Sequence, residues 1–311
     1  MPIPSPYAER LSRIQIERHE VDVTGGRTAY WTYGPSTEAQ TPSEGGDERA
    51  PLTVIAVHGF RGEHHGLEPV LAYLPELRVI APDLPGFGET APLPGRTHDL
   101  DAYAQWLTEF AAAVAPDAVI LGHSFGSIVA SAAVAGGLET PRLILINPIG
   151  APALEGPKGV LTKLAVLYYG LGAKLPAALG TALLRNGLIV RGMSIAMAKT
   201  KDSDLRRFIH GQHDTYFSDF ADRDVLRDAF VASVSHDVRE FAPDIDVPTL
   251  LIAAQDDDIT PIEAERRLAT LFSDAELVEI ADVGHLIHYE TPEEAAGAIR
   301  RFLRVPVARG R

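Results

Sequence analysis

The chain has 311 residues, a formal charge of −14 at pH 7, and ordinary fractions of hydrophobic (46%) and charged (23%) residues. This charge disfavours nucleic acid and anionic membrane surfaces as partners, and the lack of cysteine excludes disulfides and thiolate chemistry and fits a reducing, cytoplasmic location. The N-terminus has no leader pattern and no stretch reaches about 18 uncharged apolar residues, so neither a secretory signal nor a membrane span is expected.

The first half of the chain alternates strand patterns with helical patterns. Alternating apolar and polar residues over 14–23, a Gly25-Gly26 turn and a run over 28–33 predict an antiparallel hairpin, and residues 34–51 predict a long exposed loop. Buried strands are then expected over 52–57, 78–81, 118–122 and 143–146, with helices near 67–74, 100–114 and 128–137. This alternation predicts a mostly parallel, doubly wound α/β sheet with helices on both faces.

Residues 149–242 interrupt the alternation. They contain no clear buried strand, and their apolar spacing predicts helices near 157–170, 174–199, 202–212 and 223–238. Strands over 247–254 and 276–280 and helices over 262–272 and 292–303 then complete the pattern, and the tail from 305 is expected to fray. We therefore predict one α/β core formed by 1–148 and 243–311, with a helical cap inserted over 149–242.

The most informative motif is Gly122-His123-Ser124-Phe125-Gly126, which joins a strand pattern to a helical pattern rich in small residues. Gly-x-Ser-x-Gly in that setting is typical of a nucleophile elbow, a sharp turn that lifts the serine hydroxyl above the sheet. The glycines keep side chains out of the crowded turn. A serine hydroxyl is a weak nucleophile, so Ser124 would need a base to take its proton and an acid to orient that base.

Candidates for the base and the acid follow the last two predicted strands. The site of an open parallel sheet forms at the carboxyl ends of its strands. His285 stands there after Gly284, whereas His288 is second choice and is expected to pack on the final helix. Three consecutive aspartates occupy 256–258, although such a run is also typical of a solvated loop. The order serine, aspartate, histidine is the one expected with this type of turn.

An oxyanion formed during acyl transfer needs two backbone N–H donors. Phe125, directly after the serine, is one candidate, and Phe60, in the loop after the first buried parallel strand, is the other. Arg61 and His123 are candidate substrate contacts. Arg61 could hold a substrate carboxylate bidentately, and an ordinary surface position is the alternative interpretation.

The remaining histidines do not predict a metal site. His58 is interpreted as a structural residue that braces its loop. The Glu63-His64-His65 run has no third ligand spaced to join it, and His210 and His213 are expected on a solvated helix face. No metal and no other cofactor is expected.

Taken together, these segments resemble the α/β-hydrolase superfamily, in its serine-nucleophile branch with a helical cap. The resemblance covers nearly the whole chain. It rests on residues 58–60, 83–88 and 122–126, on an aspartate with Pro261 four residues later, and on Gly284-His285. It implies a triad of Ser124, Asp257 and His285, because the register of Pro261 selects Asp257 over its two neighbours.

Two positions depart from the family pattern. Ala254 replaces a glycine, and the segment that begins at Asp83 runs to Glu89-Thr90 where the family usually has serine. Asp83 is interpreted as a structural residue. Epoxide hydrolases and haloalkane dehalogenases of this fold use aspartate as the nucleophile, so Ser124 argues against their chemistry.

The expected activity is hydrolysis of a small, fairly apolar carboxylic ester through an acyl-enzyme on Ser124. The same triad could instead cleave a C–C bond in a diketone, a lactone, or an amide such as an N-terminal prolyl peptide, with perhydrolysis as a side activity. The non-enzymatic alternative is a receptor-like protein that uses the fold to bind a ligand. The expected partner is a small acyl compound, whose identity would depend on residues 149–242, and oligomeric state is left open.

Overall fold

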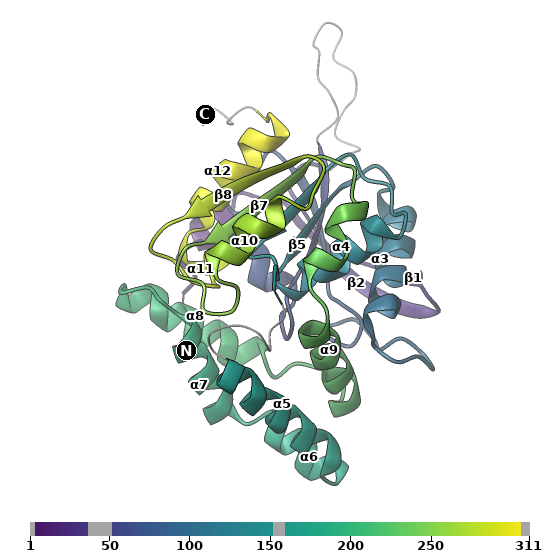
Figure 1. Cartoon of the computed structure of the whole chain (residues 1–311), viewed down its shortest axis with the longest axis vertical. Helices are drawn as coiled ribbons and strands as arrows, with labels where there is room; N and C mark the ends of the chain where they lie inside the picture. Colours follow the sequence, from purple (N-terminus) through teal and green to yellow (C-terminus); the bar gives the residue numbers. More distant parts are fainter. Residues whose placement is uncertain (1–3, 37–51, 152–158, 306–311) are drawn as a thin grey trace, which may run out of the picture.

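A computed structural model describes residues 4–36, 52–151 and 159–305. The predicted loop over 37–51 and the tail beyond 305 lie outside the described residues. Figure 1 shows a sheet flanked by helices, with a group of helices gathered at one end of the molecule.

One eight-stranded sheet forms the core, in the order β1-β2-β4-β3-β5-β6-β7-β8. Its strands are β1 (Ile16–Val23), β2 (Gly26–Tyr33), β3 (Thr53–Val57), β4 (Arg78–Pro82), β5 (Val119–His123), β6 (Leu143–Ile146), β7 (Thr249–Ala254) and β8 (Ala275–Ile280). The hairpin β1–β2 is antiparallel and joins β4 antiparallel, whereas all pairs from β4 to β8 are parallel. The central strands are buried on both faces because helices cover both, which confirms the predicted fold class.

Helices of the core lie on the two sides of this sheet. They are α1 (Ala8–Leu11), α2 (Glu68–Leu71), α3 (Leu100–Val114), α4 (Phe125–Ala135), α10 (Ile262–Ala269), α11 (Ile287–Glu290) and α12 (Pro292–Leu303), with short 3₁₀ turns η2 (His64–Leu67), η3 (Val238–Glu240) and η4 (Ala242–Asp244). One buried apolar cluster joins the sheet to α3 and α4, and a second joins it to α2 and α12. Helix α3 has the predicted bounds, since the Asp99 side chain caps it by accepting from Ala102 N at 2.9 Å.

Five helices separate β6 from β7: α5 (Gly159–Lys174), α6 (Ala177–Leu184), α7 (Gly187–Met197), α8 (Ser203–Tyr216) and α9 (Arg223–Ser235). We call α5–α9 the cap helices, and they form the helical group at one end of Figure 1. The predicted single helix over 174–199 is wrong. Pro176 has no N–H to continue a helix from α5, and Asn186 starts α7 by accepting from the N–H groups of Leu188 and Ile189.

Candidate active site

Ser124 occupies a sharp turn between β5 and α4. Its backbone has φ 53° and ψ −118°, a conformation that a residue with a side chain rarely adopts. A Cβ atom on Gly122 would lie 2.3 Å from the carbonyl oxygen of Gly126, and one on Gly126 would lie 2.3 Å from that of Val57. Only glycine fits at either position, so the turn keeps Ser124 partly exposed while its neighbours are buried.

Ser124, His285 and Asp257 form one hydrogen-bonded chain at the carboxyl ends of the parallel strands. Ser124 Oγ lies 2.8 Å from His285 Nε2, and His285 Nδ1 lies 2.8 Å from Asp257 Oδ2. A carboxylate only accepts hydrogen bonds, so Nδ1 carries the imidazole proton and Nε2 is free to accept from the serine hydroxyl. The arrangement places a base on the hydroxyl and an acid behind the base, which is the requirement for nucleophilic catalysis by serine.

Asp257 is held in its ionised form by its surroundings. Burial raises its pKa, but the nearby His285 charge and the hydrogen bonds to the carboxylate lower the pKa by more, so it lies below the usual value. The backbone N–H groups of Ile259 and Thr260 donate to Oδ1 at 2.7 and 3.2 Å. Asp258, by contrast, pairs with Lys199 at 2.5 Å, so of these two neighbours the structure brings Asp257 onto the histidine.

Asn147 also contacts Asp257, and the sequence analysis did not select it. Its side-chain amide donates to Asp257 Oδ2 at 3.2 Å from the loop that follows β6. The backbone of Asn147 has φ 43°, a left-handed conformation that asparagine tolerates better than most residues. Its position at the carboxyl end of a central strand was the available signal, since the carboxyl ends of the parallel strands β3 to β8 meet at one edge of the sheet.

The two predicted oxyanion donors flank the serine turn. Phe125 is the first residue of α4, where a backbone N–H has no partner within the helix. Phe60 lies in the loop after β3, and the neighbouring Gly59 packs on the turn, since a Cβ there would come within 3.1 Å of Ser124 Cβ. Across the described residues, neither Phe60 N–H nor Phe125 N–H has a hydrogen-bond acceptor. Both are free to donate to a substrate oxygen.

Arg61 is not on the surface, so that interpretation is wrong. Its side chain is buried, with only 3% of the residue exposed, and its guanidinium bridges to the cap helices. Nε donates to Phe217 O at 2.7 Å, NH2 to Leu184 O at 2.8 Å, and NH1 to the Tyr169 hydroxyl at 3.1 Å. Three of its five N–H groups therefore fasten α5, α6 and α8 to the loop that carries Phe60.

His123, the other candidate substrate contact, is buried below the serine turn. Its ring centroid lies 5.9 Å from that of His285 and 4.1 Å from that of His288. Burial, followed by the electrostatic effect of the neighbouring His285 and His58 rings, lowers the pKa of His123 to about 3, so its ring is neutral at pH 7. His288 is buried as well and packs against His123 from the short helix α11, with the two ring planes tilted by 59°.

The expectation of a solvated face for His210 and His213 is wrong. Both are buried where α8 packs against α7, and the Ser194 hydroxyl lies 2.6 Å from His210 Nδ1 and 2.7 Å from His213 Nδ1. Burial, then the charges of His210 and Arg191, lowers the pKa of His213 to about 3. These histidines are internal polar contacts of the cap helices.

A buried acid lies close to Asp257. Glu265, on α10, is only 2% exposed. Burial and then the negative charge of Asp257 raise its pKa well above the usual value. Nothing in the spacing of α10 distinguishes Glu265 from the exposed Glu263 two residues earlier.

Other polar residues near the site have structural contacts. His58 Nε2 accepts from Leu84 N at 2.8 Å, and its Nδ1 lies 2.8 Å from Gly59 O, as expected for a residue that braces the loop. Asp83 Oδ1 accepts from His64 N at 2.8 Å, and its Oδ2 accepts from Glu89 N at 2.9 Å. No cluster of three or more metal-ligating side chains occurs within the described ranges.

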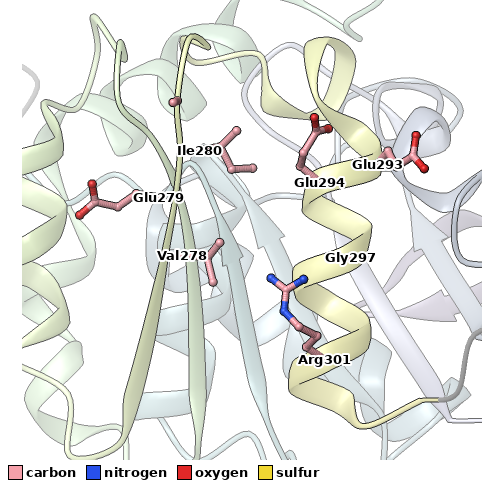
Figure 2. Close-up of a pocket in the computed structure, with 8 residues that line it drawn as sticks. Val278, Glu279, Ile280, Glu293, Glu294, Gly297 and Arg301 are labelled. Carbon is pink, nitrogen blue, oxygen red and sulfur yellow. The ribbon is translucent and has the colours of Figure 1, made fainter.

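A surface groove of about 570 Å³ lies between β8 and α12, lined by residues 278–281, Glu293, Glu294, Gly297 and Arg301. Figure 2 shows Val278 and Ile280 on the β8 side of the groove and Arg301 on the α12 side. No triad residue lines it, so we do not assign it to the active site.

Comparison with known proteins gives the family. Residues 54–298 match the model of the alpha/beta hydrolase family. A 2-hydroxy-6-oxo-6-(2'-aminophenyl)hexa-2,4-dienoic acid hydrolase of Metapseudomonas resinovorans is 27% identical over 269 residues, 80% of this chain and 83% of that protein. A pimeloyl-[acyl-carrier protein] methyl ester esterase of Aromatoleum aromaticum is 28% identical over 262 residues, 81% of this chain and 98% of that protein.

Solved structures agree on the fold. The enol-lactonase of Burkholderia xenovorans LB400 superimposes with a TM-score of 0.72 at 18% identity, covering 92% of this chain and all of that one. An esterase of Thermogutta terrifontis gives a TM-score of 0.68 at 24% identity, covering 93% of this chain and 98% of the other. With the family model spanning most of its length, the chain belongs to the α/β-hydrolase family of enzymes.

Proposed function

We propose that the protein hydrolyses a neutral carboxylic ester through an acyl-enzyme on Ser124. The observation that carries this proposal is the continuous hydrogen-bonded chain Ser124–His285–Asp257, with the serine in a strained turn. A binding protein would have no need to hold a serine at φ 53° under a neutral imidazole. The curated esterase that matches over four fifths of this chain adds support for an ester substrate.

The proposed reaction begins with Ser124 Oγ attacking the ester carbonyl carbon while His285 Nε2 takes the hydroxyl proton. The carbonyl oxygen becomes an oxyanion that accepts hydrogen bonds from the N–H groups of Phe60 and Phe125. The protonated imidazole donates to the departing alkoxide, so the alcohol leaves and the acyl-enzyme remains. His285 then takes a proton from water, the hydroxide attacks the acyl carbon, and the carboxylic acid leaves as Ser124 regains its proton. Asp257 orients His285 and stabilises its charged form.

Cleavage of a C–C bond in an acidic compound is the main alternative, because one curated relative is named for a dienoic acid substrate. Such a substrate would require an inward cation for its carboxylate. Arg61 was the candidate, but it is only 3% exposed, and three of its five N–H groups already contact Phe217 O, Leu184 O and the Tyr169 hydroxyl. This geometry favours an uncharged substrate over an acidic one.

The test is a hydrolysis panel with one purified sample. It compares neutral esters of increasing acyl length with a lactone, an amide and a carboxylate-bearing diketone. We expect the neutral esters to give the highest kcat/KM. A diketone acid with kcat/KM about tenfold above every ester would overturn the ester assignment while leaving the triad intact.

Labelling with a fluorophosphonate probe tests the nucleophile separately. We expect wild-type protein to be labelled and Ser124→Ala not to be, with a fall in kcat of about 10⁴- to 10⁶-fold. Ser131→Ala is the matched control, because Ser131 is a buried serine of the same helix α4 with no hydrogen-bond partner for its hydroxyl in the described chain. Absence of labelling in the wild type would favour the receptor-like alternative.

A further inference from the structure

The net charge of the segment that forms α5–α7 is positive, opposite in sign to that of the whole chain. Although the whole chain carries −14, residues 156–201 contain no aspartate or glutamate. The basic residues in this range are Lys158, Lys163, Lys174, Arg185, Arg191, Lys199 and Lys201. Lys199 and Arg191 are paired with Asp258 and Asp214, whereas Lys174 and Arg185 are exposed and have no acidic partner within the described residues. One Arg185 N–H donates to Phe220 O and the guanidinium lies over the Phe220 ring, which leaves its other N–H groups for an external anion. The net charge therefore gives the wrong sign for this part of the surface.

The same helices expose large aliphatic side chains. Of the ten exposed large hydrophobic residues in the described chain, six lie on α5–α7: Val166 (42%), Leu167 (57%), Leu171 (47%), Leu179 (60%), Leu188 (84%) and Ile195 (60%). We call these six residues, with Lys174 and Arg185, the cap outer face. Large aliphatic side chains exposed in this number on three successive helices are typical of a surface that binds an apolar partner.

The spacing along each helix shows that the exposure is directional. Leu167, Leu171 and Lys174 follow each other at intervals of four and three residues, so they lie on one side of α5. Leu188 and Ile195 are seven residues apart and share one side of α7. The opposite sides are buried, as Tyr169, Leu184 and Val190 show. In Figure 1, α5, α6 and α7 lie at the end of the molecule remote from the sheet, so no core element covers them.

Exposed aliphatic residues flanked by lysine and arginine match the composition of surfaces that lie in the headgroup region of anionic bilayers. A second copy of the chain fits less well, because its cap outer face would bring more cations to the interface and no carboxylate to pair with them. An acidic protein partner would complement the positive charge of the cap outer face, but binding to it would not explain the six exposed aliphatic side chains.

We propose that the cap outer face binds the surface of a bilayer containing anionic phospholipid, with the aliphatic side chains in the headgroup–acyl boundary and Lys174 and Arg185 against the lipid phosphates. Attachment is peripheral, since no helix of the described chain is both long and apolar enough to span a membrane. The cap helices would then meet apolar compounds dissolved in the bilayer. This inference stands without the proposed ester activity, because it concerns a different surface.

The test measures flotation of the full chain with lipid vesicles in the absence of any substrate. One set is pure phosphatidylcholine, and the other contains about 30 mol% phosphatidylglycerol. We expect binding to the anionic vesicles about tenfold stronger than to the neutral ones, and a large loss of binding as NaCl rises from about 0.05 to 0.5 M. Because the whole protein is strongly negative, such binding requires a local cationic surface.

Matched double variants locate the surface. Leu179→Glu/Leu188→Glu should weaken binding to the anionic vesicles at least about tenfold. Ile16→Glu/Leu271→Glu adds the same two charges at residues that are each 40% exposed elsewhere, and should bind as wild type does. Circular dichroism and thermal unfolding check that each variant is folded.

Three outcomes would overturn the proposal. The first is that the wild type does not float with anionic vesicles. The second is that both double variants lose binding equally, because the effect would then come from total charge. The third is a wild-type dimer in light scattering that Leu179→Glu/Leu188→Glu dissociates, because the cap outer face would then bind a second copy. Hydrolysis does not enter these measurements, so failure here and failure of the ester proposal are separate results.

Discussion

Asn147 donates its side-chain amide to Asp257 Oδ2, the same oxygen that accepts from His285 Nδ1. A hydrogen bond to a charged group contributes about 1.5–3 kcal/mol. Here it fixes the carboxylate that orients the base. We expect Asn147→Gly to lower kcat by about tenfold or more, because glycine accepts the φ of 43° and removes only the amide.

Asn147→Asp provides the contrasting variant. It would place a second carboxylate beside Asp257, and two like charges cannot both ionise without cost. The pH dependence of kcat/KM should therefore change for Asn147→Asp and keep its shape for Asn147→Gly. If both variants turn over like the wild type, Asn147 does not position the triad.

The strained turn at Ser124 should lower the stability of the fold, although the serine is needed for activity. Its backbone at φ 53° and ψ −118° costs about 1–3 kcal/mol for a residue with a Cβ, while glycine loses about 0.5–1 kcal/mol more backbone entropy on folding. Ser124→Gly should therefore unfold at a higher temperature than Ser124→Ala, and both should be inactive. Calorimetry of the two variants checks this, and equal or reversed melting temperatures would argue against stored strain.

Arg61 should contribute strongly to the attachment of the cap helices. Lysine keeps the charge but cannot reproduce the three directed contacts to Phe217 O, Leu184 O and Tyr169, so Arg61→Lys should lower the free energy of unfolding by about 2–4 kcal/mol. It should also speed proteolytic cleavage within the cap helices. Arg185→Lys is the control, since Arg185 is exposed, donates one hydrogen bond, to Phe220 O, and lies over the Phe220 ring; a loss as large there would contradict the prediction.

Buried neutral histidine should make the fold sensitive to acid. The folded-state pKa of His213 is lowered to about 3, below the usual value near 6.5, so its contribution is present above about pH 6.5 and is lost as the pH falls toward 3. We expect His213→Gln to reduce the pH slope of unfolding free energy by about 1.4 kcal/mol per pH unit over that window. Urea unfolding at several pH values measures this slope. His236→Gln is the control, because the His236 side chain is 38% exposed.

The stability that Glu265 contributes should depend on pH in the opposite direction to that of His213. Its raised pKa means that the folded chain keeps a proton which the unfolded chain releases near pH 4.3. Its contribution to stability is complete below that pH and is lost as the pH rises through the folded-state pKa. Glu265→Gln should therefore gain stability relative to the wild type from acid to neutral pH, while Glu263→Gln, exposed on the same helix, should follow the wild-type curve. A constant difference across pH would show that Glu265 is ionised.

The parts of the site that sequence predicts are those set by local sterics and strand order. Gly122 and Gly126 are required by contacts within a few residues of the turn, so the pattern alone places Ser124. His285 follows from its place after the last strand. The position of Arg61 was misjudged because its burial depends on cap helices more than a hundred residues away. The burial of His210 and His213 likewise depends on Ser194 of α7, a partner that periodicity does not reveal.

Arg61 follows Phe60 directly, and this adjacency links two properties of the enzyme that are usually treated separately. The guanidinium holds carbonyl groups of residues 184 and 217, while the preceding N–H is the proposed donor to the oxyanion. A displacement of the cap helices that admits a larger molecule would pull on the same short loop. A cap variant that accepts a larger substrate because its Arg61 contacts are loosened should therefore have a lower turnover number.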